Sequence, residues 1–380
     1  MRNAGAPGAQ GAAGAAGAAG APGAAGAAGA SGLSGVARSA KADAPARLVV
    51  LAPNWLGDAV MALPLLRDVR RQWPDAKIVI AARSGVAPLF AMVPGVGGVV
   101  VLEGGGGRGA VTRVRTNTAR LAEGKFDAAL LLPNSFAAAW LVRRAGIGER
   151  WGYARDLRGR LLTRPVPRLR QYGHQVEYYQ ALGTALGVPA GPPHAAIVIT
   201  EPVRAAARTL LEESGVAAGE PFVVFAPGAA YGRAKQWLPE RFAELAHMLS
   251  ADGVRTVLVG SKGDAGACQK VGRLAPAIDL AGRTDLPVLA ALLAQARAVV
   301  SNDSGAMHLA AAAGARVTAV FGPTNEQKTS PLAASADAAP PSIVAADVWC
   351  RPCMLRECPI DHRCMTQIHA ARVHATLPTI

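Results

Sequence analysis

The sequence lacks the features that mark a membrane-spanning or exported chain. None of its runs of large apolar residues reaches the roughly 18 residues that a transmembrane helix needs. The first 45 residues contain no apolar core of the kind that a secretory signal requires. We therefore expect a cytoplasmic protein without a membrane span.

Aromatic and acidic residues are both scarce. Phe, Trp and Tyr make up 5% of the chain, and 26 acidic residues stand against 40 Lys and Arg, a formal net charge of +14. Such a charge favours polyanionic partners, namely nucleic acid, an anionic membrane surface or phosphorylated substrates. The arginines are dispersed and are not interleaved with aromatics, which disfavours nucleic acid. We expect peripheral contact with an anionic inner-membrane surface and no nucleic-acid partner.

Proline is too scarce near the N-terminus for a collagen-like triple helix. Gly recurs at every third position from Gly5 to Gly35 with mostly Ala between, and only Pro7 and Pro22 supply proline. We interpret residues 1–45 as a disordered Gly/Ala-rich extension that takes no part in the fold.

The remaining sequence alternates short apolar strands with helical segments, a pattern typical of α/β proteins with parallel sheets. The expected strands are 48–52, 77–81, 99–102, 128–132, 222–226, 256–260, 298–301 and 317–321. The expected helices are 59–71, 88–93, 134–144, 174–187, 201–214, 239–250, 291–296 and 306–313. We predict an N-terminal domain at 46–195, a C-terminal domain at 196–348, and a Cys-rich segment with a tail at 349–380.

A strand, a polar turn and a helix follow one another in VVSNDSGAMHLAAAAGARVTAVFGP, residues 299–323. Free backbone N–H groups at such a helix N-terminus bind anions. Gly305 would let a phosphate approach the backbone, and His308 lies one turn beyond Ser304 on the same helix face. The alternative is an ordinary turn in which Asp303 caps the helix.

Two other stretches carry candidate chemistry. In APNWLGDAVMALPLL, residues 52–66, Asp58 follows a buried strand, where open α/β sheets bind ligands. Asp58 could serve there as a general base, or it could simply cap the following helix. In APGAAYGRAKQWLPERFAEL, residues 226–245, Lys235 could neutralise a diphosphate or be an ordinary surface lysine. We interpret Trp237 as a packing residue.

In this order, the Gly-Asp turn, the motif P-G-x6-K-x-W-x-x-E-x-F and the motif N-D-S-G-x-x-H resemble the ADP-heptose:lipopolysaccharide heptosyltransferases of glycosyltransferase family 9. The resemblance extends from about residue 47 to about residue 365 and is greatest to the heptosyltransferase II branch. It implies the GT-B fold, in which two Rossmann-like, doubly wound parallel-sheet domains face a central cleft. It also implies inverting transfer of L-glycero-D-manno-heptose from ADP-heptose to the first heptose of a lipid A-core acceptor.

The resemblance assigns roles to individual residues. Asp58 would take the proton of the acceptor hydroxyl, and Lys235 would stabilise the leaving diphosphate. The implied donor-binding residues are Asp303, Ser304, Gly305, His308, Asp264 and Gly228. The implied acceptor-binding residues are Asn54, Arg143, Arg144 and Arg155. The three arginines belong to an Arg-rich stretch between residues 143 and 172, for which a solvated basic face is the alternative.

The sequence gives little reason to expect a metal or cofactor. It contains no Asp-x-Asp pair of the kind that metal-dependent transferases use. Four of its five cysteines lie in CRPCMLRECPIDHRC, residues 350–364, a spacing that suits zinc or an iron–sulfur cluster. Reduced thiols near the cleft are an alternative, and disulfides are a third. Because the family's chemistry requires no metal, we predict no metal and no cofactor.

Other functions remain open at this point. The acceptor could be Kdo or another heptose, as for heptosyltransferase I. The same fold would also suit a sugar-nucleotide epimerase, although few candidate carboxylates besides Asp58 are present for that chemistry. A non-catalytic binding module is a further alternative.

Overall fold

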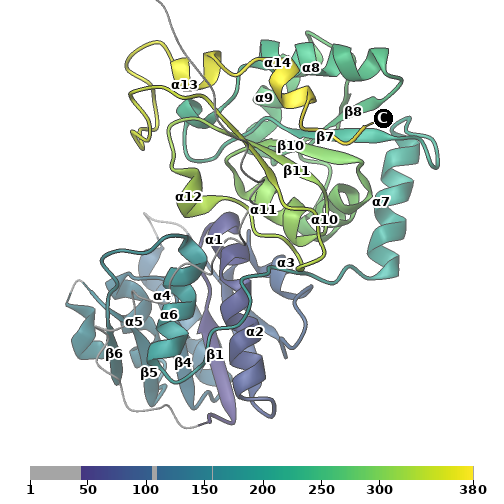
Figure 1. Ribbon diagram of the computed structural model, residues 1–380. Helices are drawn as coiled ribbons and strands as arrows, with labels where there is room; N and C mark the ends of the chain where they lie inside the picture. Colours follow the sequence, from purple (N-terminus) through teal and green to yellow (C-terminus); the bar gives the residue numbers. More distant parts are fainter. Residues whose placement is uncertain (1–43, 105–108, 156, 380) are drawn as a thin grey trace, which may run out of the picture. The chain divides into compact units, whose positions relative to one another are not determined.

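The computed structural model describes residues 44–104, 109–155 and 157–379. The extension that we interpret as disordered lies almost wholly outside these residues. The described residues form two parallel sheets of six strands each, with helices packed against them (Figure 1). The predicted α/β class, with two doubly wound parallel-sheet domains, is confirmed.

The first sheet has the strand order β3-β2-β1-β4-β5-β6. Its strands are β1 (Arg47–Leu51), β2 (Lys77–Arg83), β3 (Val99–Leu102), β4 (Ala128–Leu131), β5 (Glu149–Ala154) and β6 (Arg164–Pro167). The helices of this half are α1 (Leu56–Met61), α2 (Leu63–Gln72), α3 (Ala87–Phe90), α4 (Ala110–Glu123), α5 (Phe136–Arg144) and α6 (Gln175–Ala185), with the 3₁₀ helix η1 (Arg158–Leu161). Leu48, Val49 and Val50 of the central β1 are wholly buried, as expected for a strand covered on both faces.

The second sheet has the strand order β12-β11-β10-β7-β8-β9. Its strands are β7 (Phe222–Ala226), β8 (Arg255–Leu258), β9 (Ile278–Asp279), β10 (Ala298–Asn302), β11 (Val317–Phe321) and β12 (Ser342–Ala345). Its longer helices are α7 (Glu201–Glu213), α8 (Pro239–Ala251), α9 (Ala265–Gly272), α10 (Leu286–Gln295) and α11 (Gly305–Ala312). The short ones are α12 (Glu326–Thr329), α13 (Arg363–Thr366), α14 (Ala370–His374), η2 (Arg233–Lys235) and η3 (Lys262–Asp264).

The end of the chain belongs to the core of this second half. Cys364, Met365, Ile368 and Val373 are buried in the same hydrophobic cluster as the strands and α8. Trp237 is also buried there and donates its indole N–H to the carbonyl of Ile368 at 2.9 Å. The interpretation of Trp237 as a packing residue is therefore confirmed.

The predicted helix 59–71 is wrong in detail, because the chain forms two helices. The first begins three residues earlier, at Leu56, and the second begins at Leu63. Pro64 explains the break, since it has no N–H to continue the hydrogen-bond ladder of the first helix. Strands β5, β6, β9 and β12 and helices α4, α9, α12, α13 and α14 were not predicted.

Candidate active site

A cavity of about 580 Å³ lies at the carboxyl ends of β7 and β10, and residues of α1 form part of its wall. Open α/β sheets bind ligands at this end of their strands. All of the predicted catalytic and donor-binding residues line this cavity: Asp58, Lys235, Asp303, Ser304, Gly305, His308, Asp264 and Gly228. Residues from four separate stretches of the sequence are thus brought to one place.

Asp58 lies within the first turn of α1, whose N-cap is Trp55. The alternative that Asp58 caps a helix is therefore wrong. Burial is the main cause that raises the pKa of its carboxyl above the usual value. The Tyr179 hydroxyl, 3.5 Å from Oδ1, and the charge of Lys235 act to lower that pKa, while Asp303 acts to raise it. A partly buried carboxylate with a raised pKa is a suitable proton acceptor.

Lys235 and Asp303 form a buried ion pair in the wall of the cavity. The Lys235 ammonium lies 2.7 Å from Oδ2 of Asp303, and the two side chains are 14% and 5% exposed. Asp303 also accepts a hydrogen bond from the Thr324 hydroxyl. Lys235 is the last residue of η2, and its ammonium also lies 4.8 Å from the centre of the Tyr231 ring. The interpretation of Lys235 as an ordinary surface residue is wrong.

The turn before α11 is capped by Ser304 and not by Asp303. The Ser304 hydroxyl accepts a hydrogen bond from the N–H of Ala306 at 3.3 Å, while the Asp303 carboxylate pairs with Lys235. The first turn of α11 therefore presents backbone N–H groups beside a fixed cation. Together these groups can hold an anion such as a diphosphate.

Two glycines let α1 and α11 approach closely. A Cβ atom on Gly57 would lie 2.8 Å from Cδ2 of His308, and one on Gly305 would lie 2.9 Å from Cβ of Leu56. His308 is buried, and burial lowers its pKa to about 4, so its ring is neutral at pH 7. Among the described residues no group bonds its Nδ1. The structure thus gives Gly305 a packing role that the sequence did not indicate.

Asp264 and Gly228 lie against each other at the ends of β8 and β7. Asp264 accepts hydrogen bonds from the N–H and hydroxyl of Ser261, at 2.9 and 2.7 Å, in a capping box. A Cβ on Gly228 would fall only 2.1 Å from Oδ1 of Asp264. Only glycine fits at position 228 with Asp264 in this place.

The predicted acceptor residues are not gathered in this cavity. Asn54 lines a separate cavity of about 270 Å³ at the carboxyl ends of β1, β2 and β4. Arg143, Arg144 and Arg155 are exposed and line neither of these two cavities.

Other arginines of the predicted basic stretch are structural. Arg158 is wholly buried and donates to the carbonyls of Tyr153, Pro133 and Ser135. Arg150 donates to the carbonyls of Ile147, Gly148 and Leu161. The stretch as a whole is therefore neither a solvated face nor a single clamp.

Two features of the site were not predicted. One is Tyr179 on α6, whose hydroxyl reaches Asp58; burial and the nearby Asp58 charge raise its pKa well above the usual value, so it remains a neutral donor. Only a long-range contact reveals this role, and the sequence around Tyr179 carries no motif for it.

The second unpredicted feature is the contact between the Cys-rich segment and the loop that ends at Lys235. His362 Nε2 lies 2.7 Å from the carbonyl oxygen of Ala234, and the Ala234 N–H donates to the carbonyl of Arg356 at 2.9 Å. The Tyr231 hydroxyl donates to the carbonyl of Met354 at 2.8 Å. This segment therefore supports the backbone on which Lys235 stands.

All five cysteines lie in the described part of the chain and are free thiols. Burial raises the pKa of Cys364 to about 11 and that of Cys268 to about 12, so both remain protonated. Within residues 44–104, 109–155 and 157–379, no group of three or more His, Cys, Asp or Glu side chains is arranged to hold a metal ion. That no metal is used stays a prediction.

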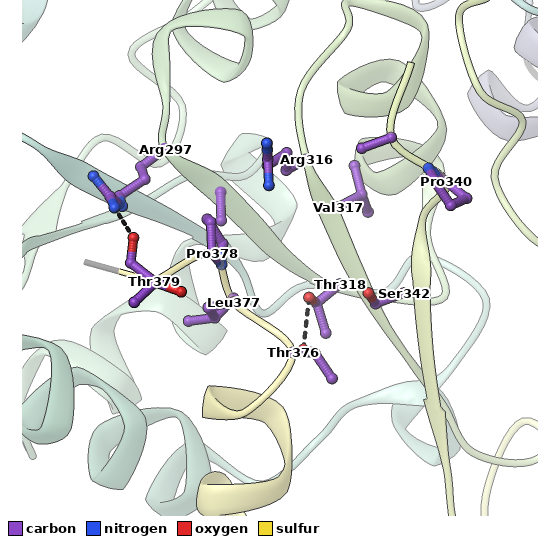
Figure 2. A pocket seen from close by; sticks show the side chains of 12 residues that line it. Arg297, Arg316, Val317, Thr318, Pro340, Ser342, Thr376, Leu377, Pro378 and Thr379 are labelled. Atoms are coloured by element: carbon purple, nitrogen blue, oxygen red, sulfur yellow. Dashed lines mark hydrogen bonds between the residues drawn. The ribbon is translucent and has the colours of Figure 1, made fainter. Parts of the chain in front are cut away.

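Another cavity, of about 600 Å³, lies at the opposite ends of the second sheet, where β10, β11 and β12 begin (Figure 2). It is lined by Arg297, Arg316 and the hydroxyls of Thr318 and Thr376, which lie 2.9 Å apart. Arg297 donates to the carbonyl of Thr379, which also lines this cavity. None of the predicted catalytic and donor-binding residues lines this cavity, so we do not place the active site there.

The two parallel-sheet halves, with a carboxylate and a fixed cation lining one cavity, are an arrangement that the GT-B glycosyltransferases share with other doubly wound proteins. Residues 114–363 match the profile of glycosyltransferase family 9 (heptosyltransferase). The chain belongs to this family.

Relatives and solved structures agree with this assignment. The chain is 33% identical over 302 residues to lipooligosaccharide heptosyltransferase 2 of Haemophilus influenzae, covering 75% of this chain and 86% of the relative. It is 31% identical over 300 residues to lipopolysaccharide heptosyltransferase 2 of Escherichia coli, covering 75% and 85%. The structure of E. coli ADP-heptose LPS heptosyltransferase II superimposes with a TM-score of 0.71 at 27% identity, covering 87% of this chain and 97% of that one.

Proposed function

We propose that this protein transfers L-glycero-D-manno-heptose from ADP-heptose to the first heptose of the lipopolysaccharide inner core, with inversion at the anomeric carbon. The observation that carries the proposal is the placement of Asp58 and the Lys235–Asp303 pair in the walls of one cavity. The names of the relatives, heptosyltransferase 2, support the choice of donor and acceptor.

The geometry supports a single displacement. The acceptor hydroxyl oxygen attacks the anomeric carbon of the donor while the bond from that carbon to the diphosphate oxygen breaks. Asp58 takes the hydroxyl proton, and ADP leaves with the electron pair of the broken bond. Lys235 and the N–H groups that open α11 stabilise the negative charge that grows on the diphosphate.

The remaining residues divide between donor and acceptor. Asp264 would hold the adenosine ribose. The absence of a side chain at Gly228 leaves room for the Asp264 carboxylate in the cavity wall. His308 is neutral and can donate one hydrogen bond to a phosphate oxygen. Asn54, Arg143, Arg144 and Arg155 would contact the sugars and anionic groups of the lipid A-core acceptor, on the cytoplasmic face of the inner membrane.

The membrane contact in this proposal is peripheral. In the part of the chain that the structure describes, no helix is both long and apolar enough to cross a bilayer. An acceptor carried by lipid A would bring the enzyme to the membrane surface.

The test is a mass-resolved transfer assay. Purified protein is incubated with ADP-heptose in three parallel reactions. These contain a core acceptor that ends in Kdo, in one heptose or in two heptoses. A single added heptose on the one-heptose acceptor, with one ADP released for each transfer, is the expected result. Transfer to the Kdo acceptor alone would identify the protein as a heptosyltransferase I, and no transfer to any acceptor would refute the proposal.

A further inference from the structure

In the first half, exposed large apolar side chains and arginines lie on α5 and on two elements that contact it, α4 and η1. Phe136 and Trp140 lie one helical turn apart on α5 and are 48% and 37% exposed. Val111, in the first turn of the neighbouring α4, is 73% exposed, and Leu157, at the start of η1, is 81% exposed. We call these four side chains the α5 surface. Large apolar side chains gathered on one exposed face mark an interaction site more often than isolated ones do.

Positive charge flanks the α5 surface. Arg143 and Arg144 follow Trp140 on the same helix and are exposed, and the guanidinium of Arg144 lies 5.3 Å from the centre of the Trp140 ring. Helix α5 has no acidic residue, and Arg155 and Arg160, which follow it in the chain, are also exposed. Glu149 is already paired with Arg164 at 3.2 Å. We therefore expect a partner of this surface to carry negative charge.

The combination of aromatic, aliphatic and arginine side chains fits a lipid surface better than a soluble polyanion. Trp and Phe insert at the boundary between headgroups and acyl chains, while arginines on the same element attract anionic headgroups. A free oligosaccharide or nucleic acid would use the arginines but would leave Phe136, Val111 and Leu157 without a contact. Leu157 also has a left-handed backbone conformation (φ +62°), which is uncommon for a leucine. Its side chain makes almost no buried contact within the protein.

The α5 surface adjoins the cavity that carries Asn54. Trp140 and Ala137 of α5 and Arg113 of α4 line that cavity, so its wall and the exposed face share the same helices. A bilayer against this face would bring lipid headgroups to the mouth of the cavity.

We propose that the α5 surface docks on an anionic bilayer and thereby presents a lipid-anchored acceptor to the Asn54 cavity. The inference rests on the proposed function for the identity of the acceptor, but the membrane contact can be tested without it. The arginines attract the anionic headgroups, and the four apolar side chains insert at the boundary between headgroups and acyl chains.

The test uses the full chain and the double variant Phe136→Ser/Leu157→Ser, because neither residue lines either cavity. Binding to vesicles of phosphatidylethanolamine and phosphatidylglycerol is measured by co-sedimentation, with phosphatidylcholine vesicles as the neutral comparison. We expect the parent to bind the anionic vesicles and the double variant to bind them about tenfold more weakly. Leu274→Ser, which removes a 47% exposed apolar side chain from the second half, serves as the matched control and should bind like the parent.

Transfer activity separates membrane docking from catalysis. The double variant should act on a delipidated heptose acceptor like the parent, and should lose activity only on acceptor embedded in vesicles. Val111→Ser, on a different helix, repeats the test should the double variant fold poorly. Equal vesicle binding by parent and variants would overturn the proposal, as would a change in self-association without a change in vesicle binding. If the parent binds vesicles but transfers nothing to the delipidated acceptor, the proposed function fails while the docking surface stands.

Discussion

At the scale of single residues, the environment of Asp58 decides how well it can act as a base. Burial favours its neutral form, while the Tyr179 hydroxyl and the Lys235 charge favour its carboxylate. The balance leaves its pKa above the usual value, which makes the carboxylate a better proton acceptor than an exposed aspartate. The hydrogen bond from Tyr179 is the part of this balance that a conservative substitution can remove.

Tyr179→Phe should therefore raise the pKa of Asp58 further. The base must be ionised to work, so activity falls as the pH falls through this pKa. The acidic limb of the pH profile of kcat/KM should move to higher pH in the variant, with little change at alkaline pH. Tyr153→Phe is the matched control, because the Tyr153 hydroxyl donates to the Tyr178 carbonyl at 2.7 Å and not to Asp58. An acidic limb that stays in place would remove Tyr179 from the catalytic site.

His308 should make the fold sensitive to acid. Its pKa is lowered from 6.5 to about 4 by burial, so the unfolded chain binds a proton at higher pH than the folded chain does. The unfolding free energy is unaffected by His308 ionisation above pH about 6.5. It decreases as the pH falls from there towards about 4, because the unfolded chain takes up the proton first. Between pH about 7.5 and pH about 5, the parent should lose about 2 kcal/mol more unfolding free energy than His308→Asn. Urea unfolding at both pH values gives the comparison, and parallel losses in the two proteins would contradict it.

At the scale of secondary-structure elements, the close approach of α1 and α11 holds the site together. Helix α1 carries Asp58, and the N-terminus of α11 follows the Lys235–Asp303 pair. Gly57 and Gly305 lie in the contact between these helices, each facing a side chain of the other helix. A small change in this contact should therefore move the base relative to the diphosphate site.

Gly305→Ala should separate these helices, because its Cβ would lie 2.9 Å from Cβ and 3.1 Å from Cδ2 of Leu56. We expect a loss of about 1–3 kcal/mol in unfolding free energy, the usual cost of overpacking, together with lower turnover. Leu56→Ala in the same chain should restore part of both losses. Gly266→Ala is the control, since this glycine also stands in the first turn of a helix and a Cβ there would meet nothing within 4 Å. A Gly305→Ala variant as stable and active as the parent would contradict the packing argument.

The Cys-rich segment should act on turnover through the Lys235 loop. His362→Ala removes the 2.7 Å contact with the Ala234 carbonyl and should lower kcat by about tenfold through misplacement of Lys235. A merely structural role would lower the melting temperature and leave kcat of the folded fraction unchanged, so both are measured. His247→Ala is the matched control, because it removes a similar contact, 3.1 Å from the Leu274 carbonyl, outside the active-site cavity.

The sequence predicted strands that are continuously apolar, and it missed strands in which polar residues or prolines interrupt the apolar ones. Strands β7 and β11 are wholly buried, and their predicted bounds are those of the structure. Strand β6, RPVP, was missed because an edge strand tolerates the prolines and polar residues that disfavour a central one. The site residues that belong to local motifs were predicted to share one site. Tyr179 and the support from residues 354–362 were not, because both act through contacts between distant stretches of the chain.

At the scale of the whole molecule, the fold serves to bring a base and a diphosphate site together from distant parts of the chain. Asp58 comes from the first half and Lys235 and Asp303 from the second, and all three line one cavity. The strands place these residues at their carboxyl ends, so the same chain connectivity builds both the sheets and the site.

The measurement that tests this account most directly is the rate of heptose transfer by Asp58→Asn, set beside its affinity for ADP. Asparagine keeps the shape of aspartate but cannot take a proton, so we expect turnover to fall by about 10²-fold or more. ADP affinity, measured by calorimetry, should stay close to that of the parent, because Lys235 and α11 are unchanged. Transfer of heptose by Asp58→Asn at the parent's rate, with normal ADP binding, would contradict the assignment of Asp58 as the catalytic base.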